Sequence, residues 1–558
     1  MKRGAFTFVL HSHLPYCRQA GRWPHGEEWL HEAIAETYVP LLRNLCNLAE
    51  QGIAPRLTLG ITPVLADQLA DKLVVEHFEI YAQDRADRAR NDVERFQRLG
   101  DAQGETLARF YADYYDGVLE TFRDRFKRSL LGVARGLQDA GHIEVLTSAA
   151  THGYLPLLSR DSSIYGQLST GVQTYRRHFG RAPRAVWLPE CAYRPAYREG
   201  PDENAPVRPG LESFLAQVGL RLFFVETHTI EGGMPVGKAR EEVIGPYGNI
   251  PRRYVVPLPE HVAPVSGTTY LPYYVGRPDV AAIGRNNQTG LQVWSADYGY
   301  PGDFDYREFH KKDGTSGMQY WRVTGARIDL GQKDYYHPDW AAGKVREHAQ
   351  HFSQMVEELV ADYNTRSGRY GVVAAIYDTE LFGHWWFEGV DWLAEVLRNL
   401  ANSEVVELTT ASDYVTGHPP EDVVALPESS WGMGGNHFTW DNADTHWMWP
   451  TIHEAEARME RLVARYPQAD GTAREVLDQA ARELLLLESS DWPFLITTGQ
   501  AAEYAIERFC AHSGRFDRLA ERAESGDFDQ AAAEQARELY ERDKLFPEID
   551  YRVFAERR

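Results

Sequence analysis

The sequence of 558 residues lacks the marks of several large protein classes. Its four cysteines are scattered and form neither a C-x-x-C pair nor the spacing of a disulfide framework or a zinc knuckle. No run approaches the roughly 18 apolar residues of a membrane span, and the apolar stretch at 5–10 is too short for a signal peptide. We therefore expect a soluble protein of a reducing cytoplasm.

Positive charge is also scarce, because 59 Lys and Arg face 81 Asp and Glu, a formal net charge of −22. A phosphate backbone or an anionic membrane would repel such a chain, which argues against nucleic acid and membrane as partners and favours a neutral substrate. Aromatic residues are plentiful instead, with 30 Tyr and 14 Trp. Most of them are expected to pack in the core or at its rim.

Short apolar runs alternate with helical patterns over the first 410 residues, as in a parallel sheet or barrel. We predict seven strands and a weaker eighth, in order at 6–10, 56–61, 143–147, 185–188, 220–225, 291–294, 372–377 and 405–408. Apolar residues at three- and four-residue spacing predict helices at 28–50, 105–139, 451–486 and 499–556.

The pattern of the chain changes after about residue 415, where the strand signals stop. The sequence thus predicts an α/β barrel domain at 1–415, with a helical insertion at about 66–141, and an all-helical domain at 416–558. Two irregular segments, 195–212 and 297–342, are long for loops of a compact domain, and such segments are usually lids or binding walls.

Polar residues follow six of the predicted strands. In strand order they are His11 and His13, then His152, Glu190, the pair Glu226 and His228, Asp297, and the pair Asp378 and Glu380. The carboxyl ends of parallel strands share one face, which holds the active site of barrels and open α/β sheets. We therefore expect these side chains to converge.

His11 and His13 allow three interpretations. Alternate residues of an extended segment point the same way, so the pair could ligate a metal with a carboxylate from elsewhere. No third ligand follows in a familiar spacing such as H-E-x-x-H, however. The two imidazoles could equally donate hydrogen bonds to sugar hydroxyls, which we favour, or serve only in packing.

Glu190 and Asp378 end separate strands, and aromatic residues flank each of them. A helix cap or an ion pair with Arg194 would be an ordinary role for Glu190 alone. Two such acids also fit retaining glycoside cleavage, which needs two carboxyls roughly 5–5.5 Å apart, one to attack the anomeric carbon and one to protonate the leaving oxygen. Flanking indoles would help to keep one of them protonated near neutral pH.

Five ordered stretches carry a resemblance to a known family. They are HSHLPY at 11–16, THGYLP at 151–156, WLPEC at 187–191, YDTELFGHWW at 377–386 and ESSDWPF at 488–494. They resemble the five motifs of glycoside hydrolase family 57, and the α-1,4-glucan branching enzymes of that family are the most similar. The resemblance extends from residue 5 to about 510, and it implies an incomplete (β/α)7 barrel.

The resemblance also implies roles for single residues. Glu190 matches the nucleophile of the family, and Asp378 matches its general acid/base. Trp294 matches an aromatic residue that lines the acceptor site, and Trp431 and Trp440 match a tryptophan pair at the entrance of the groove.

Further positions follow from the same resemblance. Asp491 belongs to a motif through which the helical domain contributes to the active-site groove. Tyr247 is the candidate for a tyrosine on a loop over the site. The family uses no metal cofactor. Together with His152, Asp297, Trp385 and Trp386, the tryptophans named above are expected to bind glucan and to exclude water.

The expected reaction is transfer of a glucan from an α-1,4 bond to a 6-hydroxyl, with amylose, amylopectin or glycogen as the substrate and a monomer or small homo-oligomer as the enzyme. An α-amylase or a 4-α-glucanotransferase of the same family would share both carboxylates. Two alternatives outside the family stay open. One is a carbohydrate-binding protein with a dead site, and the other is a zinc-dependent deacetylase or mannosidase-like hydrolase. Both acids are intact, which counts against a dead site.

Overall fold

The computed structural model describes residues 2–22, 24–200, 205–235, 244–245, 248–249, 261–295, 299–325 and 328–557. Across these residues, seven parallel strands follow one another in the order β12, β1, β2, β3, β4, β7 and β11. In that order their bounds are Gly371–Asp378, Gly4–Ser12, Leu57–Ile61, Ile143–Ser148, Val186–Trp187, Leu222–Val225 and Ala281–Gly284.

The seven strands form an incomplete barrel. One bridge between Ala185 and Leu222 joins β4 to β7. On the other side, the Asn286 N–H donates to the Ala374 carbonyl of β12 (3.0 Å) just after β11 ends. The predicted α/β architecture, an incomplete (β/α)7 barrel followed by a helical region, is confirmed.

One of the predicted strands is wrong. Residues 291–294 end the helix α10 (Asn287–Trp294), and the sixth strand is β11. Both runs are short and apolar, and so short a run has no period that separates strand from helix. Asn286 decides the outcome, because its side chain accepts the Thr289 N–H (3.0 Å) and starts the helix before the apolar residues are reached.

The weaker eighth strand is peripheral. It exists as β13 (Val406–Leu408), which pairs only with the first three residues of β1. The expectation that strands stop at 415 misses β14 (Val423–Val424), which pairs with β10 (Tyr273–Val275). Two short hairpins complete the described strands, β5 (Tyr197–Arg198) with β6 (Val207–Arg208), and β8 (Ile244–Gly245) with β9 (Gly248–Asn249).

β1 is buried along its whole length, which its nearly continuous apolar sequence anticipates. Alternate side chains of a strand point to opposite faces, so β1 contributes to two cores. Phe6, Phe8 and Leu10 pack with the outer helices, whereas Val9 belongs to the inner core that continues into the helical region. The barrel wall is therefore covered on both faces.

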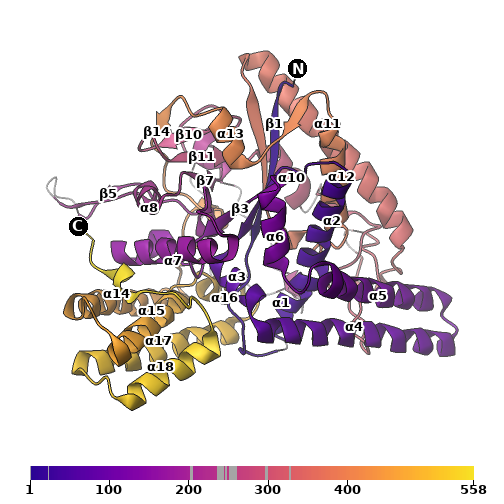
Figure 1. Cartoon of the computed structure of the whole chain (residues 1–558). Coiled ribbons are helices and arrows are strands. Elements are labelled where there is room, and N and C mark those ends of the chain that lie inside the picture. The colour runs from indigo at the N-terminus through magenta and orange to yellow at the C-terminus, as the bar shows by residue number, and fades with distance from the viewer. Residues whose placement is uncertain are drawn as a thin grey trace.

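A long helical hairpin stands between β2 and β3, in the stretch where we predict an insertion. It consists of α4 (Lys72–Leu99) and α5 (Ala102–Glu120), at the lower right of Figure 1, preceded by α3 (Pro63–Ala70) and followed by α6 (Leu130–Asp139). Asp71 caps α4 by accepting the Leu73 N–H (3.0 Å). Gly100 ends α4 in a left-handed conformation (φ 68°) that glycine adopts without strain.

The remaining helices cover the barrel or follow it. Those of the barrel are α1 (Glu27–Ala33), α2 (Val39–Glu50), α7 (Asp161–Phe179), α8 (Leu211–Val218), α9 (Thr227–Glu231), α11 (Pro338–Ser367), α12 (Gly389–Ala401) and α13 (Ala411–Gly417). Those of the C-terminal region are α14 (Met448–Arg465), α15 (Gly471–Leu487), α16 (Asp491–Thr498), α17 (Ala502–Ser525) and α18 (Gln530–Asp543). The domain boundary itself stays a prediction.

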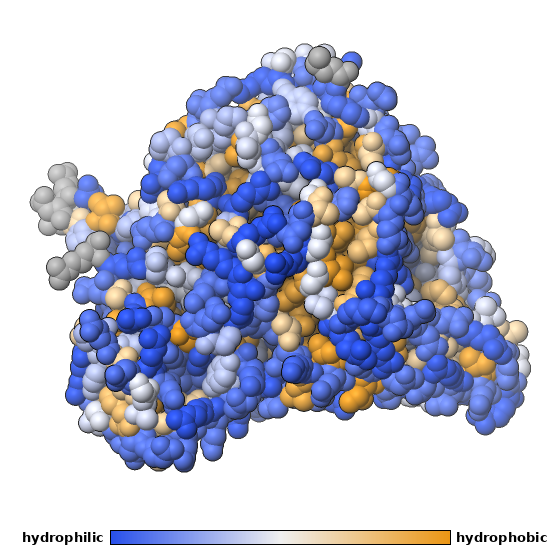
Figure 2. Space-filling view, in the orientation of Figure 1, coloured by the Kyte–Doolittle hydropathy of each residue, from blue (hydrophilic) through white to orange (hydrophobic). Residues whose placement is uncertain are grey.

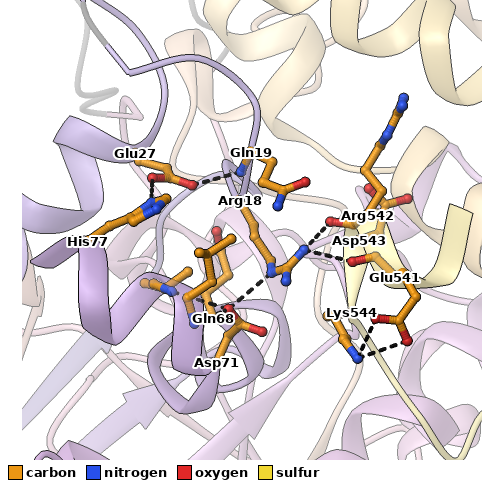
Figure 3. Close-up of polar contacts among 12 residues, drawn as sticks. Arg18, Gln19, Glu27, Gln68, Asp71, His77, Glu541, Arg542, Asp543 and Lys544 are labelled. Atoms are coloured by element: carbon orange, nitrogen blue, oxygen red, sulfur yellow. Dashed lines mark hydrogen bonds and ion pairs between the residues drawn. The ribbon is translucent and has the colours of Figure 1, made fainter. Parts of the chain in front are cut away.

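Polar contacts join the segment after β1 to the C-terminal helices. Figure 3 shows Arg18 between the barrel and the end of α18. Its Nε lies 3.0 Å from Asp71 Oδ1, and its Nη1 donates to the carbonyls of Glu541 (3.0 Å) and Arg542. Nearby, the Tyr16 hydroxyl donates to the Asp543 carbonyl (2.8 Å). The segment that follows β1 is thus held from both sides.

The outer surface is mostly hydrophilic on the face drawn in Figure 2, with hydrophobic residues gathered along its middle. Within the described chain, no helix is long and apolar enough to cross a membrane.

Candidate active site

The carboxyl ends of β1, β3, β4 and β12 meet at the end of the barrel near the start of α16. His11 lies directly beside Asp378 in the parallel ladder of β1 and β12. The ring of His11 stacks on Trp187 of β4 with 4.8 Å between ring centroids. Its Nε2 is 3.1 Å from Nε2 of His152, which follows β3. Side chains from four strand ends therefore converge, as the sequence predicts.

Glu190 stands in a strained turn directly after β4. Pro189 ends the strand, since it has no N–H to donate, and Glu190 then adopts φ 60°, a left-handed conformation uncommon outside glycine. Its Oε2 accepts the indole N–H of Trp431 (2.8 Å), and its Oε1 accepts the Ser490 hydroxyl (3.4 Å). His152, 3.7 Å from Oε1, has φ 58°. Strained residues of this kind cluster at functional sites.

Three imidazoles stack beside Glu190. The ring centroids of His13 and His152 are 3.9 Å apart, and those of His11 and His152 are 5.1 Å apart. Burial and the two neighbouring rings lower the pKa of His152 well below its ordinary value, so this ring is neutral. Burial also opposes charge on His13, but Asp491 Oδ1, 2.9 Å from Nε2, outweighs it and raises the pKa of His13.

The helical region completes the site through the residues before and at the start of α16. The Ser490 N–H donates to the His152 carbonyl (3.1 Å), and the Ser490 hydroxyl lies 2.8 Å from His152 Nδ1. The Ser489 hydroxyl donates to Asp491 Oδ2 (2.7 Å). Asp491 is therefore where the sequence predicts it. Ser490 is a site residue that sequence reasoning missed, although it adjoins Asp491 in the same motif.

Glu380 is a second residue to which the sequence assigned no role. It is 7% exposed and accepts the Tyr38 hydroxyl and the backbone N–H of His13 (3.2 Å). Burial, with a smaller contribution from Asp378, raises the pKa of Glu380 to about 8. A neutral acid therefore adjoins Asp378 at neutral pH. Its position two residues after Asp378 was the signal, but adjacency in sequence does not reveal burial.

The tryptophan pair expected at a groove entrance lies inside the protein. Trp431 is 5% exposed, packs on Trp187 (4.8 Å between centroids) and bonds Glu190. Trp440 is fully buried and stacks on Tyr154 (4.2 Å). Gly432 permits this packing, because a Cβ at this residue would lie 2.5 Å from the Trp440 ring. The entrance assignment is therefore corrected: Trp431 holds Glu190, and Trp440 belongs to the core.

The other predicted tryptophans divide in the same way. Trp386 is 2% exposed and packs on Trp392 (5.3 Å between centroids), so it is a core residue and not a sugar contact. Its neighbour Trp385 is 45% exposed and stacks on Phe309 (4.4 Å). Trp294, at the end of α10, is also partly exposed. Sugar contact by Trp385 and Trp294 stays a prediction.

The remaining predictions for the site concern a loop, a carboxylate and a metal. Tyr247 and Asp297 lie outside the described residues. A metal between His11 and His13 would need a ring nitrogen of each. His11 Nε2 faces His152, however, and the two ring nitrogens of His13 face Thr62 Oγ1 (3.1 Å) and Asp491 (2.9 Å). These ring nitrogens therefore have partners within the protein, and sugar contact by His11 and His13 stays a prediction.

Comparisons with known proteins give the class. The model of glycosyl hydrolase family 57 matches residues 7–427, and the chain belongs to this family. The model described as 1,4-alpha-glucan branching enzyme, C-terminal, matches residues 451–554, so the end of the chain is that of the branching enzymes.

Individual relatives agree with this class. The 1,4-alpha-glucan branching enzyme of Thermococcus kodakarensis is 45% identical over 98% of this chain and 77% of its own. The crystal structure of that enzyme with glucose gives a TM-score of 0.89 over 100% of this chain and 97% of that one, at 43% identity. A family 57 branching enzyme of Pyrococcus horikoshii gives 0.87 at 42% identity over the same shares. An alpha-amylase of Thermotoga maritima gives 0.81 at 32% identity, covering both chains fully.

Proposed function

We propose that this chain is a 1,4-α-glucan branching enzyme that works by a retaining double displacement. The observation that carries the proposal is that two imidazoles in contact with each other lie between the strand-end acids Glu190 and Asp378. Asp378 lies beside His11, His11 contacts His152, and His152 approaches Glu190. Membership of family 57 and the branching-enzyme C-terminal region support it further.

In the first step, a carboxylate oxygen of Glu190 attacks the anomeric carbon while Asp378 protonates the departing 4-oxygen. The indole of Trp431 and the hydroxyl of Ser490 each take one acceptor position on a different oxygen of Glu190. These contacts support the role of Glu190 as an oriented nucleophile.

In the second step, Asp378 takes the proton of an acceptor 6-hydroxyl, which attacks the glucosyl-enzyme and forms an α-1,6 bond. Because His152 is neutral, only one of its ring nitrogens donates a hydrogen bond, and this determines which of its neighbours donate and which accept. With the Ser490 hydroxyl donating to Glu190, Nδ1 of His152 donates to Ser490 and Nε2 accepts from His11. In this arrangement Glu190 accepts the hydrogen bonds from Trp431 and Ser490.

The substrate we propose is amylose, amylopectin or glycogen, and the enzyme acts as a monomer or small homo-oligomer. The ring of Trp385 is exposed and stacks on Phe309, which favours a stacking contact between Trp385 and a glucose unit. A reducing cytoplasm is the proposed compartment, because all four cysteines are free thiols.

The second candidate function is an α-amylase, and the likeness to the Thermotoga maritima enzyme favours it. Hydrolysis needs the same two acids, and only the acceptor differs. Incubation with amylose, followed by a debranching enzyme, separates the two functions. Branching gives new short side chains and little reducing sugar, whereas an amylase gives reducing ends and no α-1,6 linkages.

The roles of the two acids have a separate test, which uses an activated α-glucoside and azide. In Glu190→Ala, azide replaces the nucleophile and should give the β-glucosyl azide. In Asp378→Ala, azide intercepts the glucosyl-enzyme and should give the α-glucosyl azide. Exchange of the two products would reverse the assignment, and no azide product from either variant would count against both roles.

A further inference from the structure

Two buried arginines lie outside the reaction centre, at the base of the β5–β6 hairpin that begins seven residues after Glu190. Arg194 is 3% exposed and Arg208, on β6, is 7% exposed. Fully buried arginines normally have a carboxylate for every guanidinium, because a buried charge is costly unless it is paired. In so acidic a chain, two adjacent buried cations require an explanation.

The partners of these two arginines are few. Arg208 donates to Asp161 Oδ1 (2.6 Å) and to the Tyr197 hydroxyl (3.2 Å). Arg194 donates to the Pro195 carbonyl (3.2 Å), and its Cζ lies 4.9 Å from the centroid of the Tyr197 ring. Asp161 is thus the single carboxylate in contact with the pair in the part of the chain that the structure describes.

Three donor nitrogens of the pair have no acceptor among the described residues. They are Nε and Nη2 of Arg194 and Nη2 of Arg208, and all three are buried. Burial, reinforced by repulsion from Arg208, lowers the pKa of Arg194, while Tyr197, Asp161 and Glu428 only partly offset this. Positive charge and donor capacity therefore both exceed what the protein itself satisfies.

We propose that Arg194 and Arg208 form a binding site for a phosphate-type oxyanion, either inorganic phosphate or the phosphate group of a sugar phosphate. Guanidinium groups bind phosphate through paired N–H donors, and the three unsatisfied donors are of the kind that phosphate oxygens accept from. After Asp161 is counted, the two arginines hold one positive charge in excess, which attracts an anion.

Tyr197 is the side chain that an entering anion must pass. Its ring covers the guanidinium of Arg194, and its hydroxyl accepts from Arg208, yet it is 41% exposed. The oxyanion site also adjoins the wall of the active site, because Tyr193 exchanges backbone hydrogen bonds with Ser429 (2.8 and 3.0 Å), two residues before Trp431.

Equilibrium dialysis of the full chain with labelled inorganic phosphate tests the site, with sodium chloride keeping the ionic strength constant. We expect one phosphate per chain with a Kd below about 1 mM, and at least about tenfold weaker binding in Arg194→Gln and in Arg208→Gln. Arg198→Gln is the matched control, since Arg198 is exposed on the same hairpin and should bind as the wild type does.

Competition by glucose 1-phosphate distinguishes the two sources of the group. Displacement of labelled phosphate at lower concentration than unlabelled phosphate identifies a sugar-phosphate site, and the reverse identifies a site for the free ion. Either result supports the proposal. The proposal would be overturned if the wild type bound no phosphate at 10 mM, about tenfold above the expected Kd. It would also be overturned if both glutamine variants bound phosphate as tightly as the wild type.

Arg194→Met keeps the test decisive if the glutamine variants fold poorly. A buried guanidinium that binds a ligand destabilises the protein when the ligand is absent. Without phosphate, the methionine variant should therefore melt no lower than the wild type. It should also lose the rise in Tm that phosphate causes in the wild type. A structural cation would instead make the variant melt lower in both buffers, against the proposal. Glu190→Gln should bind phosphate normally, so failure of the oxyanion site and failure of the proposed reaction are distinguishable.

Discussion

Histidines and carboxylates gather in buried clusters at two places in this enzyme, the candidate active site and the helical region. In the helical region, Nδ1 of His512 lies 2.7 Å from Glu483 Oε2, and its Nε2 lies 3.0 Å from Arg508. Arg515 lies 3.4 Å from Asp543 and 3.9 Å from Glu483. Possible ligand atoms of Glu483, His512 and Asp543 lie within 4.8 Å of one another. Two arginines already neutralise them, however, so an added cation would gain little.

At the strand ends, neutral groups hold the carboxylates instead. An indole and a hydroxyl hold Glu190, and a phenol and a backbone N–H hold Glu380. Glu190 and His152 are also strained there. Similar residue types thus have different partners in the two clusters: arginines connect the cluster of α15, α17 and α18, whereas neutral donors contact Glu190 and Glu380 at the strand ends. Composition alone does not distinguish them.

The largest expected effect is loss of turnover when either acid of the active site is made neutral. Glu190→Gln and Asp378→Asn should each lower the branching rate by about 10⁴-fold or more, because a nucleophile or a general acid is removed. Initial rates on amylose measure this, and circular dichroism should show an unchanged fold. Near-normal rates in either variant would mean that the strand-end cluster is not the catalytic one.

The helical cluster should respond in stability and not in rate. His512→Leu removes one partner of a fully buried network and leaves Glu483 with an unmet acceptor, at a cost of about 3 kcal/mol. Urea unfolding measures the loss. The rate on amylose below the unfolding transition should stay within about threefold of the wild type. A much larger fall in rate at unchanged stability would erase the distinction between the clusters.

Ser490 tests the contact between the helical region and Glu190, the proposed nucleophile. Ser490→Ala removes the hydroxyl between Glu190 and His152, and kcat should fall by about 10- to 100-fold with the acidic limb of the pH profile shifted. Thr498→Ala is the control, since Thr498 ends the helix that Ser490 precedes and its hydroxyl donates to the Phe494 carbonyl of that helix (3.0 Å). Equal effects in both variants would indicate a general disturbance of α16.

Glu380 gives a pH-dependent effect. Its pKa is 4.5 ordinarily and about 8 when folded, so the stability from its bound proton is complete below pH 4.5 and is lost as pH rises through 8. Over that window the wild type should lose about 1.4 kcal/mol per pH unit relative to Glu380→Gln. Urea unfolding of both proteins from about pH 5 to about pH 8, the range between the two pKa values, measures the difference. If the free energies of unfolding of the two proteins changed in parallel with pH, Glu380 would ionise normally.

The smallest expected effect is that of metal removal. Dialysis against a chelator should leave the branching rate unchanged and shift the Tm by less than about 1 °C, because both clusters already have hydrogen-bonded or ionic partners. Loss of activity that zinc restores would revive the metal interpretation of His11 and His13. A fall in Tm alone would instead point to the cluster around His512.

Long apolar runs are what made most of the barrel predictable. β1 and β12 are buried on both faces and consist almost wholly of apolar residues, so their place in a covered parallel sheet followed from composition. β11 has only four residues, too few to show a strand period. The helix cap at Asn286 decided that the neighbouring apolar run at 291–294 is helical. The ends of β1 and β12 were predictable only approximately from the polar residues after each apolar run, because β1 includes His11 and Ser12 and β12 includes Asp378.

Side-chain direction was not predictable. Trp385 and Trp386 are adjacent in sequence, yet one is exposed and the other packs in the core. Trp431 turned out to bond Glu190 across 241 residues of sequence. The roles of Ser490 and Arg208 likewise depend on partners from distant elements, and no local pattern carries that information.

The sequence by itself determined the family and the parallel barrel and predicted the roles proposed for Glu190 and Asp378, because periodicity and motifs are local properties of the chain. Only the tertiary structure decided which buried charges are neutralised and which stay available. Electrostatic environment depends on distances between residues far apart in sequence, and these distances exist only after the barrel and the helical region have packed together.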